Sequence, residues 1–148
     1  MKHYLLSFSI AVITLISSPA SQAKQTLTLY DQLGGEPLVG KIVYTALEYA
    51  HSDPRIGEKF ENSNIERNSK FITEFVCALT DGPCEYTGQD MHKVHYGLGL
   101  TSAHFNAMAE CFQKSMEDYK IPFSTQNKLL ARLAPTHNDV IIRSKTGR

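Results

Sequence analysis

The 148-residue chain contains no tryptophan, only three cysteines and no excess of charge of either sign. Its 15 lysines and arginines balance its 15 aspartates and glutamates, so no basic stripe indicates binding to nucleic acid. There is no internal repeat and no low-complexity linker, and the length fits one domain. No convincing alternation predicts a β-strand, because "LTLY" (27–30) is short and runs directly into a helical pattern.

The N-terminus has the pattern of a secretion signal. A short basic start precedes an apolar run that ends in "PASQA", where Ser21-Gln22-Ala23 has the form of a signal-peptidase site. The run is too short and too rich in serine and threonine for a membrane span, which needs about 20 apolar residues. No cysteine follows it, which disfavours a lipoprotein anchor. We predict a cleaved signal at Met1–Ala23 and export, to the periplasm; the alternative is an uncleaved N-terminal anchor.

Cleavage would leave a mature chain that begins near Lys24. It has 14 lysines and arginines against 15 aspartates and glutamates, a formal charge of −1. This charge indicates no partnership with nucleic acid, and we expect no stable membrane association after cleavage.

The three cysteines are Cys77, Cys84 and Cys111. Their odd number excludes a fully paired framework, but an exported chain could join two of them. Cys77 and Cys84 lie on either side of the turn at Asp81-Gly82-Pro83, which makes them the favoured pair. Small buried or free thiols are the alternative.

Apolar residues recur at helical spacing through almost all of the mature chain. We predict an all-α domain of about six or seven helices, several of them short, which differs from a simple up-down bundle. The expected elements are a short helix opened by a weak capping box at Thr28-x-x-Asp31 and closed by Gly34-Gly35, a helix from Pro37 to Ser52, a short helix ending near Phe60, a helix from Ile65 to Leu79, a short helix around Met91–Gly97, a helix capped by Thr101 or Ser102, and a last helix opened by Ser124. Pro135 should kink or split the last helix.

Two histidines lie three residues apart in the short helix predicted around residues 91–97. Helical spacing places His95 at the edge of an apolar stripe with Met91, and His92 further round toward solvent. His95 is then either a core residue or a metal ligand. A zinc site that includes His92 is a further alternative, although the nearby Cys84, Glu85 and Asp90 form no recognised zinc pattern.

The phenylalanines are first of all candidates for the core. They are Phe60, Phe71, Phe75 and Phe105. An apolar pocket lined by such rings, with one inward-facing imidazole, is also what a haem requires, because one neutral histidine nitrogen holds its iron.

The mature chain resembles the truncated haemoglobins, most closely their group I branch. "LYDQLGG" (Leu29–Gly35) is similar to the family's first helix and glycine-pair turn, and Phe60, which ends "SDPRIGEKF", to its haem-contacting phenylalanine. "DGPCEYTGQDMHKVHYGLGLTSAHF" (Asp81–Phe105) is similar to its second glycine hinge, Tyr-Thr-Gly turn, proximal helix and next long helix. The resemblance runs from Leu27 to about Val140, within a predicted globin domain at 24–148.

This resemblance implies a fold of two crossed helix pairs, 2-on-2, around haem b. It implies that His95 is the iron ligand, and we assign no catalytic residue. The haem-contacting positions that it implies are Tyr86, Met91 and Leu98 on the proximal side, and Phe60, Asn68, Ile72, Phe75 and Leu47 on the distal side.

Two distal positions depart from the family pattern. Leu47 stands where the family usually has a tyrosine that hydrogen-bonds bound oxygen, and Tyr44 lies one turn earlier. Ile72 stands where glutamine or another polar group is often found. We therefore expect faster oxygen loss and faster autoxidation than in a tyrosine-bearing relative. Asp81 replaces the first glycine of the second hinge, and the hinge should survive because aspartate tolerates turn conformations.

The function implied is reversible binding of a diatomic gas, oxygen, nitric oxide or carbon monoxide, at the haem iron, with an electron donor as a further partner. Gas binding is favoured over enzyme activity. The alternatives are haem-dependent nitric oxide detoxification of the dioxygenase kind, haem transport or storage, and a non-haem helical domain with a structural or metal-binding role.

Overall fold

The computed structural model describes residues 26–141, so the predicted signal at Met1–Ala23 lies outside the described residues. Every regular element in this range is helical, which confirms the all-α prediction. The elements are α1 (Leu29–Gln32), α2 (Glu36–Ser52), the 3₁₀ turn η1 (Gly57–Lys59), α3 (Ile65–Leu79), α4 (Met91–His95), α5 (Ser102–Asp118), α6 (Phe123–Leu133), the 3₁₀ turn η2 (Ala134–Thr136) and α7 (His137–Val140). Within residues 26–141, no helix combines the length and the apolar character needed to cross a membrane.

Local sequence sets where α1 and α5 begin. The Thr28 hydroxyl accepts from the Asp31 backbone N–H at 3.1 Å, and the Asp31 carboxylate accepts from the Thr28 N–H at 3.1 Å. The predicted capping box is therefore present. Thr101 caps α5 in the same way, except that His104 Nδ1 takes the place of the carboxylate, 3.2 Å from the Thr101 nitrogen.

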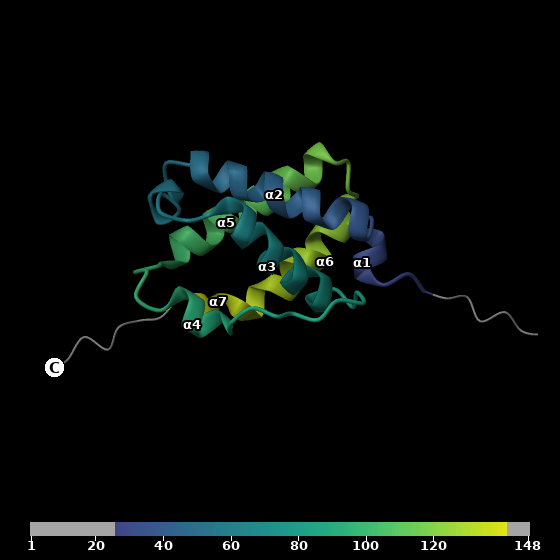
Figure 1. The fold of residues 1–148 in the computed structure, drawn as a ribbon. Helices are drawn as coiled ribbons and strands as arrows, with labels where there is room; N and C mark the ends of the chain where they lie inside the picture. The colour runs from purple at the N-terminus through teal and green to yellow at the C-terminus, as the bar shows by residue number, and fades with distance from the viewer. Residues whose placement is uncertain (1–25, 142–148) are drawn as a thin grey trace, which may run out of the picture.

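The centre of the core is α2, which packs against both α3 and α5. Its inward side chains are buried, including Val43, Ala46 and Leu47, which have no exposed surface. Figure 1 shows α2 crossing α5, and at this crossing the buried Ser115 hydroxyl donates to the Ile42 carbonyl at 2.7 Å. This arrangement covers one side of α3, on which Val76 and Cys77 are buried.

The C-terminal part folds around α6, which packs against α1 and α5, while the short α4 lies beside α7 (Figure 1). Pro135 lies in η2, so the prediction that it splits the last helix is confirmed. The prediction that Ser124 opens this helix was wrong, because α6 already begins at Phe123. The carbonyl of Pro122 accepts from the Thr125 and Gln126 N–H groups at 2.8 and 3.0 Å, which starts the helix earlier.

A charged corner follows α2 and leads to η1 and Phe60. Asp53 accepts from the Arg55 backbone N–H at 2.8 Å and from its guanidinium at 2.7 Å. The same guanidinium lies 2.7 Å from Glu110 of α5. The corner therefore ties the segment before Phe60 to α5.

We expect this corner to titrate at low pH. Hydrogen bonds from the Arg55 side chain and backbone lower the pKa of Asp53 from 3.8 to about 2. Because the folded pKa lies below the unfolded one, the stabilisation is present above pH 3.8 and is lost as the pH falls through about 2. NMR titration of the Asp53 carboxyl should show this low midpoint, and Arg55→Ala should raise it toward 3.8. An unchanged midpoint in Arg55→Ala, with Arg67→Ala as the matched control, would contradict the assignment.

Candidate functional site

Apolar side chains on α3 and α4 are much less covered than those on α2. Along α3 only Val76 and Cys77 are fully buried, and α4 buries no residue. Phe71, Ile72 and Phe75 follow one face of α3 at helical spacing, and all three remain half-buried. Such incompletely covered apolar faces fit a large flat hydrophobic group.

His95 ends α4 with one ring nitrogen engaged. Its Nδ1 lies 2.8 Å from the Met91 carbonyl oxygen one turn earlier. A carbonyl only accepts hydrogen bonds, so Nδ1 carries the proton in the neutral ring, and Nε2 keeps its lone pair. No hydrogen bond to Nε2 occurs within the described part of the chain. This arrangement is the one that a metal-binding imidazole requires.

His92 lacks the fixed ring of His95, because its ring forms no hydrogen bond within residues 26–141. It is exposed, and its ring lies 6.0 Å from that of Tyr96. Between residues 26 and 141, no three side chains of histidine, cysteine, aspartate or glutamate gather closely enough to hold a metal ion. The zinc site that includes His92, given above as an alternative, therefore has no set of ligands among these residues.

The helix that carries His95 is shorter than predicted. The short helix predicted around Met91–Gly97 is present, but its predicted end was wrong, because α4 ends at His95, Tyr96 is extended and Gly97 has φ of 80°. Leu98 therefore does not continue the apolar face of α4, and it is 45% exposed. Its role as a haem contact stays a prediction.

Three of the distal candidates meet in one core cluster. Leu47 belongs to it with no exposed surface, and Phe60 and Ile72 pack against it half-buried. Tyr44, one turn before Leu47 on α2, is 38% exposed. Asn68 is half-buried, and its side chain forms no hydrogen bond among residues 26–141.

His51 contributes to this region in a way that the sequence did not indicate. Its Nδ1 lies 2.9 Å from the Leu47 carbonyl, and its Nε2 lies 3.3 Å from the Ser63 hydroxyl. Its ring lies 5.1 Å from that of Phe60. His51 therefore supports the phenylalanine that the resemblance places against the haem. The only sequence signal was its place one turn after Leu47.

Residues 80–90, here called the return loop, connect α3 to α4. Its hinge survives as predicted, since Asp81 has φ of 63° and its carboxylate pairs with Arg132 at 2.9 Å. Cys77 and Cys84 form a disulfide, the favoured pairing, and Cys111 is a buried free thiol.

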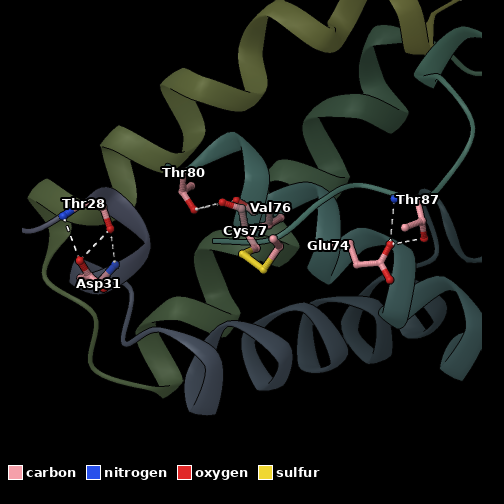
Figure 2. Close-up of a disulfide and its surroundings, with 8 residues drawn as sticks. Thr28, Asp31, Glu74, Val76, Cys77, Thr80 and Thr87 are labelled. Atoms are coloured by element: carbon pink, nitrogen blue, oxygen red, sulfur yellow. Dashed lines mark hydrogen bonds between the residues drawn. A yellow bond between two sulfur atoms is a disulfide. The ribbon is translucent and has the colours of Figure 1, made fainter. Parts of the chain in front are cut away.

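Two further contacts join the return loop to α3. The Tyr86 ring meets the edge of Phe75 with centroids 5.5 Å apart, so two of the predicted haem contacts touch. Thr87 donates two hydrogen bonds to Glu74, which Figure 2 shows beside the disulfide. Sequence reasoning missed Glu74, because its contact depends on the path of the loop.

The fold and the lone imidazole define the class of this protein as a globin, and comparisons agree. The family model for bacterial-like globins matches residues 28–141. The group 1 truncated hemoglobin of Tetrahymena pyriformis is 26% identical over 114 residues, covering 77% of this chain and 94% of that protein. The group 1 truncated hemoglobin GlbN of Mycolicibacterium paratuberculosis is 29% identical over 108 residues, covering 73% and 79%.

Solved structures give the same result. The crystal structure of the Tetrahymena pyriformis truncated hemoglobin in its Fe(III) form has a TM-score of 0.76 at 26% identity, covering 79% of this chain and all of that one. The 2/2 hemoglobin of a Synechococcus species has a TM-score of 0.73 at 23% identity, which supports the fold. This chain belongs to the bacterial-like globin family, in its truncated, group I branch. The predicted family and 2-on-2 fold are confirmed.

Haem is the cofactor of this family, which confirms that prediction, and the residues present fit it. The half-buried apolar face of α3 suits the macrocycle, and Nε2 of His95 suits the iron. The individual contact residues predicted from the resemblance stay predictions.

Proposed function

We propose that this chain binds oxygen or nitric oxide reversibly at a haem b iron held by His95. The observation that carries this proposal is the hydrogen bond from His95 Nδ1 to the Met91 carbonyl, which orients the ring and leaves Nε2 free. When bound, the haem supplies a ferrous iron with one coordination position open to a gas.

The hydrogen bond within α4 does more than fix the tautomer. A carbonyl acceptor on Nδ1 makes the imidazole a better electron donor than an unbonded ring would be, although less so than a carboxylate acceptor would. It also removes one rotational freedom from a side chain that ends a five-residue helix. His95 is therefore oriented for coordination before the haem arrives.

The distal candidates offer little polarity. The side chains of Leu47 and Ile72 have no hydrogen-bond donor, and the half-buried Asn68 lies one turn before Ile72 on α3. Gas affinity would then depend on the apolar surroundings and on His95, with Asn68 as the remaining donor. This pattern favours reversible binding with fast release.

We also propose that the mature protein works outside the cytoplasm, in the periplasm. The pattern at Met1–Ala23 supports this, and so does the disulfide Cys77–Cys84, because disulfides persist in oxidising compartments and are rare in the cytosol.

The axial role of His95 is tested by comparing His95→Gly with His92→Gly after reconstitution with haem. We expect wild type and His92→Gly to give a sharp ferrous–CO Soret band. His95→Gly should lose haem or need added imidazole, because the substitution removes the iron ligand. Absorption spectra of the ferric, ferrous and CO-bound proteins provide the measurement. Identical spectra for the two variants would refute His95 as the ligand.

The apolar distal side is tested by Leu47→Tyr, with Leu47→Phe as the matched control for ring size. A new hydroxyl that bonds the bound oxygen would stabilise it by about 1.5–3 kcal/mol, so the oxygen off-rate should fall roughly ten- to a hundredfold relative to Leu47→Phe. Stopped-flow measurement of oxygen release gives the rates. A wild-type rate already as slow as that of Leu47→Tyr, or accelerated by Tyr44→Phe, would mean that Tyr44 replaces the missing tyrosine.

Export is tested by expressing the full chain in a Gram-negative bacterium and recovering the protein from the osmotic-shock fraction. Mass spectrometry should find a mature N-terminus at Lys24, because cleavage is expected after Ala23. An intact Met1 on protein from the cytoplasmic fraction would refute the proposal, and an intact Met1 on membrane-bound protein would favour the uncleaved anchor.

A further inference from the structure

The return loop runs back along α3 and meets it at three successive places. The pairs are Cys84 with Cys77, Tyr86 with Phe75, and Thr87 with Glu74. The loop residues rise in number as their α3 partners fall, so this part of the loop lies antiparallel to α3. Figure 1 shows the same path, in which the loop passes along α3 before it reaches α4.

The last of these contacts is a charged one. Glu74 Oε2 accepts from the Thr87 backbone N–H at 3.1 Å and from its hydroxyl at 2.7 Å. Its other oxygen lies 3.1 Å from Lys70. The bonds from Thr87, with Lys70, hold the pKa of Glu74 below its usual value. Because Glu74 accepts one hydrogen bond from the backbone and one from the side chain of Thr87, it holds both parts of Thr87 in place.

Thr87 is separated from α4 by only a closed turn. The Tyr86 hydroxyl donates to the Gln89 carbonyl at 2.6 Å, and Gly88 has no room for a Cβ against the Tyr86 ring. Asp90 follows at once and caps α4 through the Lys93 N–H at 3.0 Å. The position of Thr87 therefore determines where α4 begins.

A five-residue helix is too short to hold its own position. α4 lies beside α7 on one side and is reached from α3 only through the return loop. His95 is the last residue of this helix. If the turn at residues 87–90 shifts, α4 shifts with it, and the His95 imidazole changes position.

We propose that Glu74 is a positioning residue for the axial histidine: through Thr87 it fixes the turn that begins α4, with the disulfide Cys77–Cys84 as the second link between this turn and α3. The proposal rests on the proposed function, because it assumes that His95 holds haem. Under this proposal α3 has two roles. Its apolar face lines the distal side, and its Glu74 fixes the position of His95 on the proximal side.

The test uses the haem-loaded protein with Glu74→Ala, Glu74→Gln and Lys70→Ala. The rate of haem transfer to an excess of haem-free myoglobin measures how tightly each variant retains haem. Resonance Raman spectra of the ferrous protein measure the iron–histidine stretching band. Glu74→Ala should lose haem about three- to tenfold faster and shift or broaden the band. Glu74→Gln should keep the wild-type rate of haem loss and the wild-type band, since its amide oxygen still accepts from Thr87. Lys70→Ala should match wild type, because an exposed ion pair contributes little.

Amide hydrogen exchange of the haem-free protein supplies a readout that does not depend on the haem. In Glu74→Ala, exchange should rise in residues 86–95 and stay unchanged in α2 and α5. Faster exchange throughout, with a lower melting temperature and an unshifted band, would show a merely structural role and overturn the proposal. Values for Glu74→Ala equal to those for Lys70→Ala would overturn it as well.

The second link is tested by Cys77→Ala combined with Cys84→Ala. We expect faster haem loss and more exchange in residues 84–95, both increased further when Glu74→Ala is added. Normal haem retention and a normal band in that triple variant would mean that the loop does not position His95. Failure of wild type itself to bind haem would overturn the proposed function and this inference together, whereas normal wild type with unaffected variants would overturn the inference alone.

Discussion

The packing of α2 against both α3 and α5 is the constraint on which the rest of the structure depends. Val43, Ala46 and Leu47 of α2 are fully buried. The hydrogen bond from the Ser115 hydroxyl to the Ile42 carbonyl joins α5 to α2 where the two helices cross. α2 covers one side of α3, and the face with Phe71 and Phe75 is only half-buried by the rest of the protein. In a small domain such a face is costly unless something binds there, and a haem would complete the core.

The sequence predicted the long, periodic elements and their caps. The stripes of α2 and α5, the Thr28–Asp31 box and the break at Pro135 are all set by neighbouring residues, so local patterns were sufficient. The end of α4 and the start of α6 were missed, because single backbone groups at Tyr96 and Pro122 decide them.

The candidate site likewise contains some residues that local sequence predicted and others that it did not. His95 and its neighbours came from a motif, and the bond to the Met91 carbonyl follows from the i, i+4 spacing on one helix. The contacts of His51 with Ser63 and of Glu74 with Thr87 join segments whose separation is set by loop paths. No periodicity contains that information, so sequence alone gave neither His51 nor Glu74 a role.

Under the proposed function, the two sides of the candidate site would differ in how much they control gas binding. If Leu47 and Ile72 line the distal side, that side has few polar groups with which to favour one gas over another. Discrimination would then depend on how strongly and at what orientation His95 donates to a haem iron, and its hydrogen bond to the Met91 carbonyl bears on both. A globin that works in this way would be tuned from the proximal side, so the segments that hold α4 in place would contribute to gas affinity.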